Sequence, residues 1–120
     1  MKNIEDINRE AVKKIVANKK NEVLYISRAN IPYEFKSKVK FIKKHLSVVS
    51  FKPESLIKFG KAKRAETEKT EDIELLRALD IGLKIKTTNL KGDSFSIDVF
   101  EDYTKAQLQI TKDRYFKFYR

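Results

Sequence analysis

The sequence predicts an α/β protein: a two-layer sandwich in which a mixed sheet carries helices on one face. In the first two thirds of the 120-residue chain, apolar residues mostly recur at helical spacing; in the last third they alternate as in strands. Glycine and proline are scarce, with 3 and 2 residues, which favours long elements and few loops. The length indicates a single domain, 1–120, with a leading helix (1–20), an α/β core (22–100) and a C-terminal strand extension (101–120).

The first half of the chain is expected to form helix, strand and helix. The leading helix has one apolar face, made by Ile4, Ile7, Ala11, Ile15 and Val16. Residues 22–27 (EVLYIS) are rich in strand formers and indicate a central strand. A second helix is expected over 31–46, with Pro32 in its first turn. Its buried stripe would be Phe35, Val39, Ile42 and Leu46.

The second half is expected to form strand, helix and an antiparallel tail. Within an extended region over 48–59, residues 55–59 (SLIKF) are the best strand, and Gly60 ends it. A third helix is expected over 65–79, with Gly82 near its C-terminal cap. Alternating residues then predict a hairpin of strands 83–87 and 95–99, a further strand over 106–110 and an aromatic edge strand at 114–120.

The charge of the chain is high and unevenly placed. Residues 1–64 hold 17 Lys and Arg against 6 Asp and Glu, whereas residues 65–80 hold 2 against 6. The formal net charge is +10. A basic excess of this size favours a polyanionic partner, and nucleic acid is the leading candidate. Lysine greatly outnumbers arginine, which suits phosphate contacts better than the reading of bases.

Few residues point to catalysis. His45 is the only histidine and is expected at the surface or its boundary, and cysteine is absent, so the usual transition-metal and thiol sites cannot be built. The acidic stretch could hold magnesium, but its spacing is that of a solvated helix face; it consists of Glu66, Glu68, Glu71, Asp72 and Glu74. Three glycines allow neither a phosphate-binding loop nor a dinucleotide motif. We therefore expect no enzyme, cofactor or small-molecule substrate.

The candidate binding residues are cations on the second expected helix and on the turn near Gly60. They are Lys36, Lys38, Lys43, Lys44, Lys58, Lys61, Lys63 and Arg64. The aromatic tail could stack on bases or could be a packed edge strand. Another hypothesis is a viral, plasmid or regulatory interaction protein that acts through the acidic helix face or the tail. A nuclease or nucleotide-modifying enzyme is a third hypothesis, although no acid–base pair or metal cluster supports it.

Four segments together resemble the Alba superfamily of chromatin proteins and small RNase P and RNase MRP subunits. They are EVLYISRANIPYEF, LIKFGKAKRA, DIELLRALDIGLKIKTTN and SFSIDVF. The resemblance implies a strand–helix–strand–helix–strand–strand order after the leading helix. It also implies nucleic-acid contacts by Arg28 at the first turn, by Gly60, Lys61 and Lys63 at the second, and by Lys86 and Lys91 on the hairpin.

These observations combine into one expectation: a non-enzymatic binder of nucleic acid, with RNA favoured over DNA. A subunit of a ribonucleoprotein is one form that such a binder could take. The resemblance implies a homodimer or a heterodimer with a related subunit. Because the chain has no apolar run of membrane-spanning length and no signal-peptide core, we expect an intracellular protein, cytoplasmic or nuclear, without a membrane partner.

Overall fold

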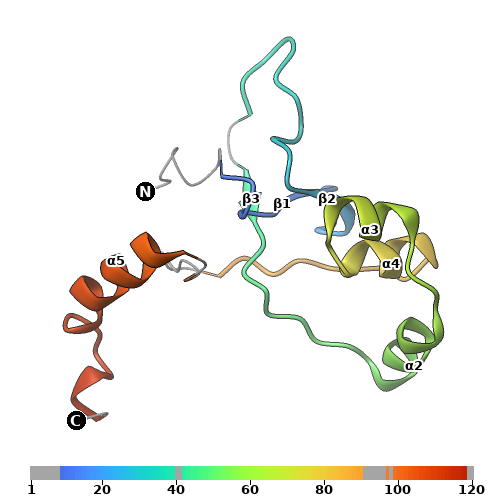
Figure 1. Ribbon diagram of the computed structural model, residues 1–120. Helices are drawn as coiled ribbons and strands as arrows, with labels where there is room; N and C mark the ends of the chain where they lie inside the picture. Colours follow the sequence, from blue (N-terminus) through green and yellow to red (C-terminus); the bar gives the residue numbers. More distant parts are fainter. Residues whose placement is uncertain (1–8, 40–41, 91–96, 98, 119–120) are drawn as a thin grey trace.

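The computed structural model describes residues 9–39, 42–90, 97 and 99–118, which form an α/β architecture around a small antiparallel sheet (Figure 1). The strands are β1 (Lys14–Ala17), β2 (Val23–Ser27) and β3 (Lys43–Lys44). The helices are α2 (Pro53–Lys61), α3 (Glu66–Glu71), α4 (Leu75–Asp80), α5 (Phe100–Ile110) and the 3₁₀ helix η1 (Phe116–Phe118). The expected α/β class is confirmed, but a mixed sheet is wrong for the described strands, because both pairings are antiparallel.

The sheet has β1 at its centre, with β2 on one side and β3 on the other. A tight turn joins β1 to β2, in which the Asn18 N–H donates to the Glu22 carbonyl at 2.9 Å and Asn21 has a φ of 60°. Asparagine is among the residues that tolerate this left-handed conformation best. Lys14 pairs with Ser27 of β2 and with Lys44 of β3, so the three strands share one end.

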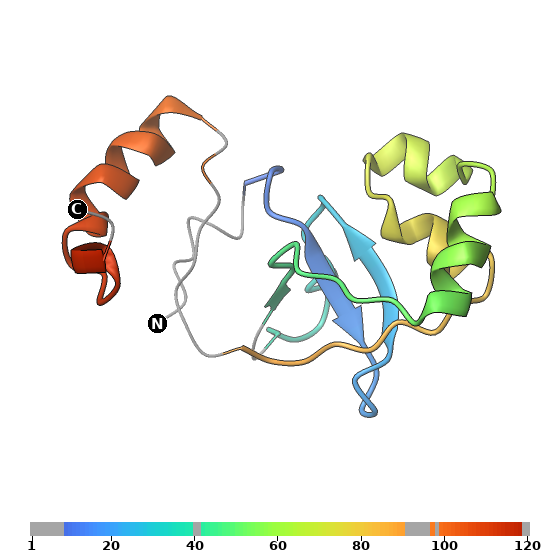
Figure 2. The same ribbon diagram turned by 90° about the horizontal axis from the view of Figure 1, so that it is seen from below.

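The core lies between this sheet and the helices α3 and α4 (Figure 2). Ile15 of β1 and Ile26 of β2 are cross-strand partners, so their side chains point to the same face of the sheet. They pack with Val23 and with the helix side, which contributes Ile73, Leu75 and Leu76. Burial of such a side chain stabilises the fold by roughly 1.5–3 kcal/mol.

A buried lysine also belongs to the sheet. Lys14 is 1% exposed, and its Nζ donates to the carbonyl oxygens of Arg9 and Arg28. Burial lowers the pKa of Lys14, and the nearby Glu10 and Glu71 carboxylates oppose this effect. Because both carbonyls lie outside the strands, Lys14 fastens the segment before β1 to the segment after β2.

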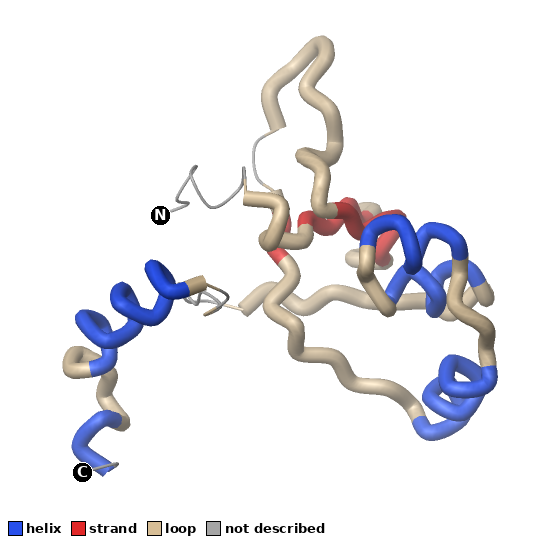
Figure 3. The backbone as a smooth tube through the Cα atoms, in the orientation of Figure 1, coloured by secondary structure: helices blue, strands red, loops and turns tan. Residues whose placement is uncertain are grey.

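Two expectations in the first half are wrong for the described residues. The last part of the expected leading helix forms the strand β1 instead, and its apolar residues pair with β2. Residues 1–8 of that expected helix lie outside the described residues. The helix expected over 31–46 is a long loop that ends in β3, and the loop extends away from the sheet (Figure 3). Phe35 of the expected buried stripe is 81% exposed, so this periodicity reflects no buried face. The strand expected over 22–27 is confirmed by β2, but its expected central position is wrong, because β2 lies at an edge of the three-stranded sheet and β1 lies at its centre.

In the middle of the chain, the strand expected at 55–59 is wrong, since these residues lie in α2. Pro53 occupies the first turn of that helix, where its missing N–H has no cost. The helix expected over 65–79 is confirmed in type but is divided into α3 and α4 at Asp72, which has a φ of 51°. Gly82, with a φ of 77°, follows α4 as expected for a cap.

The expected antiparallel tail is also wrong where the structure describes it. Residues 83–87 contribute only an isolated bridge, between Lys86 and Glu22. The strand expected over 106–110 lies in α5, and the described part of the expected edge strand contains η1. Asp102 favours the helix, because its carboxylate accepts the Val99 N–H at 3.4 Å at the start of α5. The second hairpin strand, 95–99, falls mostly outside the described residues.

Helix α5 lies apart from α2, α3 and α4 (Figures 1 and 2). The Arg9 guanidinium ties it to the segment before β1 by two hydrogen bonds to Asp102, of 2.9 and 3.0 Å. Among the residues that the structure describes, no helix combines the length and the apolar character that crossing a bilayer requires.

Candidate functional site

Charged side chains of both signs gather where the three strands end. Lys14 pairs with Ser27 and Lys44, and the next residue outward on each of these strands is Lys13, Arg28 or His45. The His45 N–H donates to the Lys13 carbonyl at 2.9 Å. Glu71, Asp72 and Glu74 approach from the end of α3 and the start of α4. We call these six residues the sheet-end cluster.

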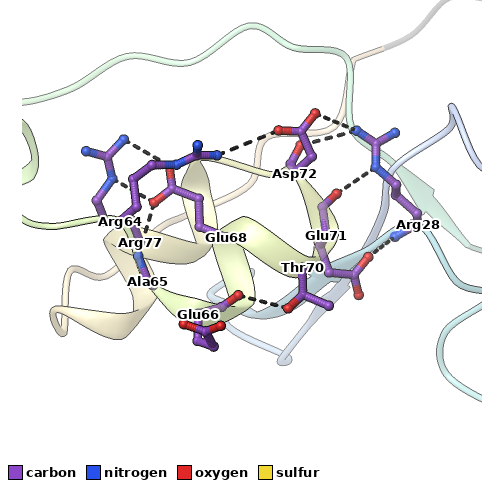
Figure 4. Close-up of polar contacts among 9 residues, drawn as sticks. All are labelled: Arg28, Arg64, Ala65, Glu66, Glu68, Thr70, Glu71, Asp72 and Arg77. Atoms are coloured by element: carbon purple, nitrogen blue, oxygen red, sulfur yellow. Dashed lines mark hydrogen bonds and ion pairs between the residues drawn. The ribbon is translucent and has the colours of Figure 1, made fainter.

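Arg28 is held firmly within the sheet-end cluster (Figure 4). Its Nε donates to the Glu71 carbonyl at 2.6 Å, and its Nη2 donates to the Asp72 carbonyl at 3.2 Å. The carboxylate of Glu71 in turn accepts the Ser27 hydroxyl at 2.6 Å and the Arg28 N–H at 2.9 Å. These contacts fix the end of β2 against α3, so Arg28 and Glu71 set the shape of the cluster.

His45 has spare hydrogen-bonding capacity in the sheet-end cluster. Its Nδ1 is buried and has no hydrogen-bond partner among the residues that the structure describes. Burial lowers the pKa of His45, the positive charge of Lys13 lowers it further, and Glu74 opposes both. A buried nitrogen without a partner is unfavourable, and a ligand hydroxyl or carboxylate reaching it would offset that cost.

A second ionic cluster, centred on Glu68, lies beside the sheet-end cluster and connects helices. The Glu68 carboxylate, with 1% of the side chain exposed, contacts the Arg77 Nε at 3.0 Å and the Arg64 Nε at 3.3 Å. It also accepts the Ala65 N–H at 3.3 Å, which caps the start of α3 (Figure 4). Arg77 stacks over the Phe59 ring at 4.3 Å. Glu68 therefore joins α2, α3 and α4, and its two arginines are engaged within the protein.

The structure does not bring the expected nucleic-acid residues into one patch. Arg28 and Arg64, which are far apart in the sequence, are brought together by Asp72, with which they form ion pairs at 3.7 and 3.8 Å. The others are distributed over four places: Lys36 and Lys38 on the exposed loop, Lys43 and Lys44 in β3, Lys58, Gly60, Lys61 and Lys63 in and after α2, and Lys86 beside β2. Lys91 lies outside the described residues.

Sequence reasoning missed most of the sheet-end cluster. Glu71 and Asp72 were expected on a solvated helix face, but they contact Ser27 and Arg28. The available signal was the dipeptide Ser27-Arg28 at the end of the strand expected over 22–27, because polar residues at strand ends often form sites. The described residues hold no group of three or more His, Asp or Glu side chains placed to bind a metal ion.

The pH dependence of unfolding should report on His45. Because its pKa is lowered in the folded protein from 6.5, the unfolded chain binds the proton more tightly. Stability should therefore fall as the pH decreases through about 6.5, the ordinary histidine pKa. We expect the melting temperature to drop between about pH 7.5 and 5.5, and His45→Asn to remove most of this drop. An equal drop in the variant would contradict the environment described for His45.

No family model matches the chain. It is 33% identical over 109 residues to the 3-deoxy-manno-octulosonate cytidylyltransferase of Thermodesulfovibrio yellowstonii, a match that covers 86% of this chain and 43% of the relative. It is 38% identical over 92 residues to the enzyme of the same name from Nitratiruptor, covering 77% of this chain and 38% of the relative. The 8-amino-3,8-dideoxy-manno-octulosonate cytidylyltransferase of Shewanella frigidimarina is 33% identical over 100 residues, covering 83% and 41%.

A solved structure shares the fold. It is a CMP:2-keto-3-deoxy-manno-octonic acid synthetase complexed with CTP, with a TM-score of 0.81 and 21% identity. The match covers 92% of this chain and 46% of that chain. The chain thus spans about two fifths of the length of the curated relatives that it matches.

These findings correct the functional expectations drawn from the sequence. The resemblance to the Alba superfamily is wrong, because the relatives are cytidylyltransferases and the structural neighbour is a CMP-sugar acid synthetase. The expectation of a non-enzymatic nucleic-acid binder without a small-molecule substrate is wrong for the same reason. The alternative of a protein-interaction factor finds no support in these relatives either.

Proposed function

We propose that this chain forms the sugar-acid-binding part of a cytidylyltransferase, which transfers the cytidylyl group of CTP to a 3-deoxy-octulosonate and releases pyrophosphate. The likeness to enzymes named for this reaction supports the reaction class. The single observation that supports the site is the sheet-end cluster, where the unpartnered Nδ1 of His45 lies near Lys13.

The chemistry of the sheet-end cluster suits a polyhydroxy acid. A carboxylate is best held by cations and N–H donors, which Lys13 and a protonated or correctly oriented His45 can provide. Sugar hydroxyls donate to carboxylates, which Asp72 and Glu74 can provide, and both residues are exposed. Cations alone would favour any anion, whereas the mixture of signs selects an anion that also carries hydroxyls.

Titration calorimetry with 3-deoxy-manno-octulosonate tests this function. We expect the chain to bind the acid, and His45→Ala to weaken binding about tenfold, as for one lost hydrogen bond to a charged group. The matched control is Lys61→Ala, because Lys61 is an exposed cation in α2 outside the sheet-end cluster. Equal weakening by both substitutions would show diffuse charge attraction, and absence of binding to the unmodified chain would also contradict the proposal.

A further inference from the structure

Lys14 is a buried charged residue that belongs to neither ionic cluster. Only 1% of it is exposed, and taking an ammonium group out of water is costly unless other groups compensate it. The next residue of β1, Ile15, is apolar and belongs to the core. An apolar side chain at position 14 would be buried without that cost, so stability alone does not account for a lysine there.

The Lys14 ammonium connects two backbone segments beside the sheet-end cluster. Its Nζ donates to the Arg9 carbonyl at 3.0 Å and also to the Arg28 carbonyl. Arg28 is a member of the sheet-end cluster, and Lys13, the residue before Lys14, is another. The lysine therefore holds the backbone of one cluster residue from inside the protein.

The segment before β1 gives this connection a fixed end. The Arg9 guanidinium forms two hydrogen bonds, of 2.9 and 3.0 Å, to the carboxylate of Asp102, which is itself buried. The carbonyl of the next residue, Glu10, accepts the Arg28 Nη1 at 3.3 Å. The same short segment thus contacts both ends of Arg28: its guanidinium directly and its carbonyl through Lys14.

The position of Arg28 depends on all of these contacts. Its Nε and Nη2 donate to the carbonyls of Glu71 and Asp72, and its backbone N–H donates to the Glu71 carboxylate (Figure 4). These bonds attach the N–H and the guanidinium to the end of α3, whereas the carbonyl is held by Lys14. A shift of that carbonyl would turn the chain that leaves β2 and move the Arg28 side chain relative to α3.

We infer that Lys14 is a positioning residue for sugar-acid binding, which fixes the Arg28 backbone and thereby the shape of the sheet-end cluster without contacting the acid. The inference rests on the proposed function, because that function defines what the cluster binds. Displacing a positioned group by about 1 Å can cost a large factor in the process that depends on it. Loss of the Lys14 bonds should therefore weaken binding although Lys14 itself is buried.

The test measures two properties of Lys14→Met, which nearly keeps the length of the side chain but removes its N–H donors. The first property is hydrogen exchange of the Arg28 Nε–H, followed by NMR without any ligand, because this group donates to the Glu71 carbonyl at 2.6 Å. The second is the binding of 3-deoxy-manno-octulosonate, measured by titration calorimetry. We expect exchange to accelerate, and binding to weaken, by about tenfold or more.

Two further variants separate positioning from a general loss of stability. Val23→Ala removes part of a buried core side chain at the opposite end of β2, so it should lower the melting temperature but change both measurements by less than about twofold. Lys14→Gln has a shorter side chain whose amide still donates without a charge. Its results should lie between those of the unmodified chain and of Lys14→Met, and it replaces Lys14→Met if that variant does not fold.

Unchanged exchange of the Arg28 Nε–H in the Lys14 variants would overturn the inference, and so would unchanged acid binding. Equal effects of Val23→Ala and Lys14→Met would also overturn it, because they would reduce Lys14 to a general stabilising residue. If the unmodified chain does not bind the acid, the proposed function fails, and faster Arg28 exchange in Lys14→Met would still show that Lys14 positions Arg28.

Discussion

Replacing Glu68 with alanine is expected to lower the free energy of unfolding by about 2–4 kcal/mol, and the melting temperature by roughly 10 °C or more. Glu68 is 1% exposed and compensates two arginines, of which Arg77 is mostly buried. Its removal also leaves the Ala65 N–H without its acceptor at the start of α3. Thermal and denaturant unfolding measure the effect.

The matched control for this substitution is Glu66→Ala in the same helix. The side chain of Glu66 is 86% exposed, and its ion pair with Lys69, at 3.2 Å, lies in solvent. Exposed pairs of this kind contribute little, so we expect a change within about 0.5 kcal/mol. Similar losses for Glu66→Ala and Glu68→Ala would mean that the buried cluster does not hold the helices together.

The second large effect is expected at Glu71, where Glu71→Ala should reduce both stability and sugar-acid binding. Its carboxylate accepts the hydroxyl of the buried Ser27 and the N–H of Arg28, and two unpaired donors cost about 2–4 kcal/mol. Because these bonds fix the end of β2, the sheet-end cluster should also lose its geometry, and binding should weaken about tenfold or more.

Two further variants separate the contributions of Glu71. Glu71→Gln keeps one acceptor oxygen, so its loss of stability should lie between those of the unmodified chain and of Glu71→Ala. Glu54→Ala removes an exposed carboxylate from the first turn of α2 and should leave sugar-acid binding unchanged. Unchanged binding in Glu71→Ala would contradict the role given to the end of β2.

The parts of the fold that were predictable from sequence depend on local signals. All of the run EVLYIS except its first residue forms β2, because strand formers flanked by polar residues need little further information. Gly82 follows α4, because its φ of 77° is one that glycine adopts readily. The helix over 65–79 was predicted in type, although its division at Asp72 was not.

The remaining parts depend on pairings between distant residues. β1 has a helix-like apolar pattern, but Ile15 pairs with Ile26 and Lys43, and tertiary pairing overrides local periodicity. For α2, the strand was predicted over residues 55–59, although Pro53 just before them is a signal of helix initiation.

The candidate site was missed because the sequence gives the number of charged residues but does not show which of them form ion pairs with one another. Lys38 forms an ion pair with Glu34 at 2.9 Å, and Lys43 donates to Asn21 and Thr87. Composition cannot show that such cations are engaged locally, nor that Glu71 faces Ser27 across 44 residues of chain. The mixture of signs that suits a sugar acid arises only when the end of the sheet meets α3 and α4.

The most direct measurement of the proposed site is an NMR titration of the His45 imidazole, the only one in the chain, with and without 3-deoxy-manno-octulosonate. In the free protein, burial and Lys13 lower the pKa of His45. A bound carboxylate would favour the protonated ring, so the pKa should rise when the acid is present and stay unchanged with mannose, which lacks the carboxylate. The same titration curve with and without saturating acid would contradict sugar-acid binding at the sheet-end cluster.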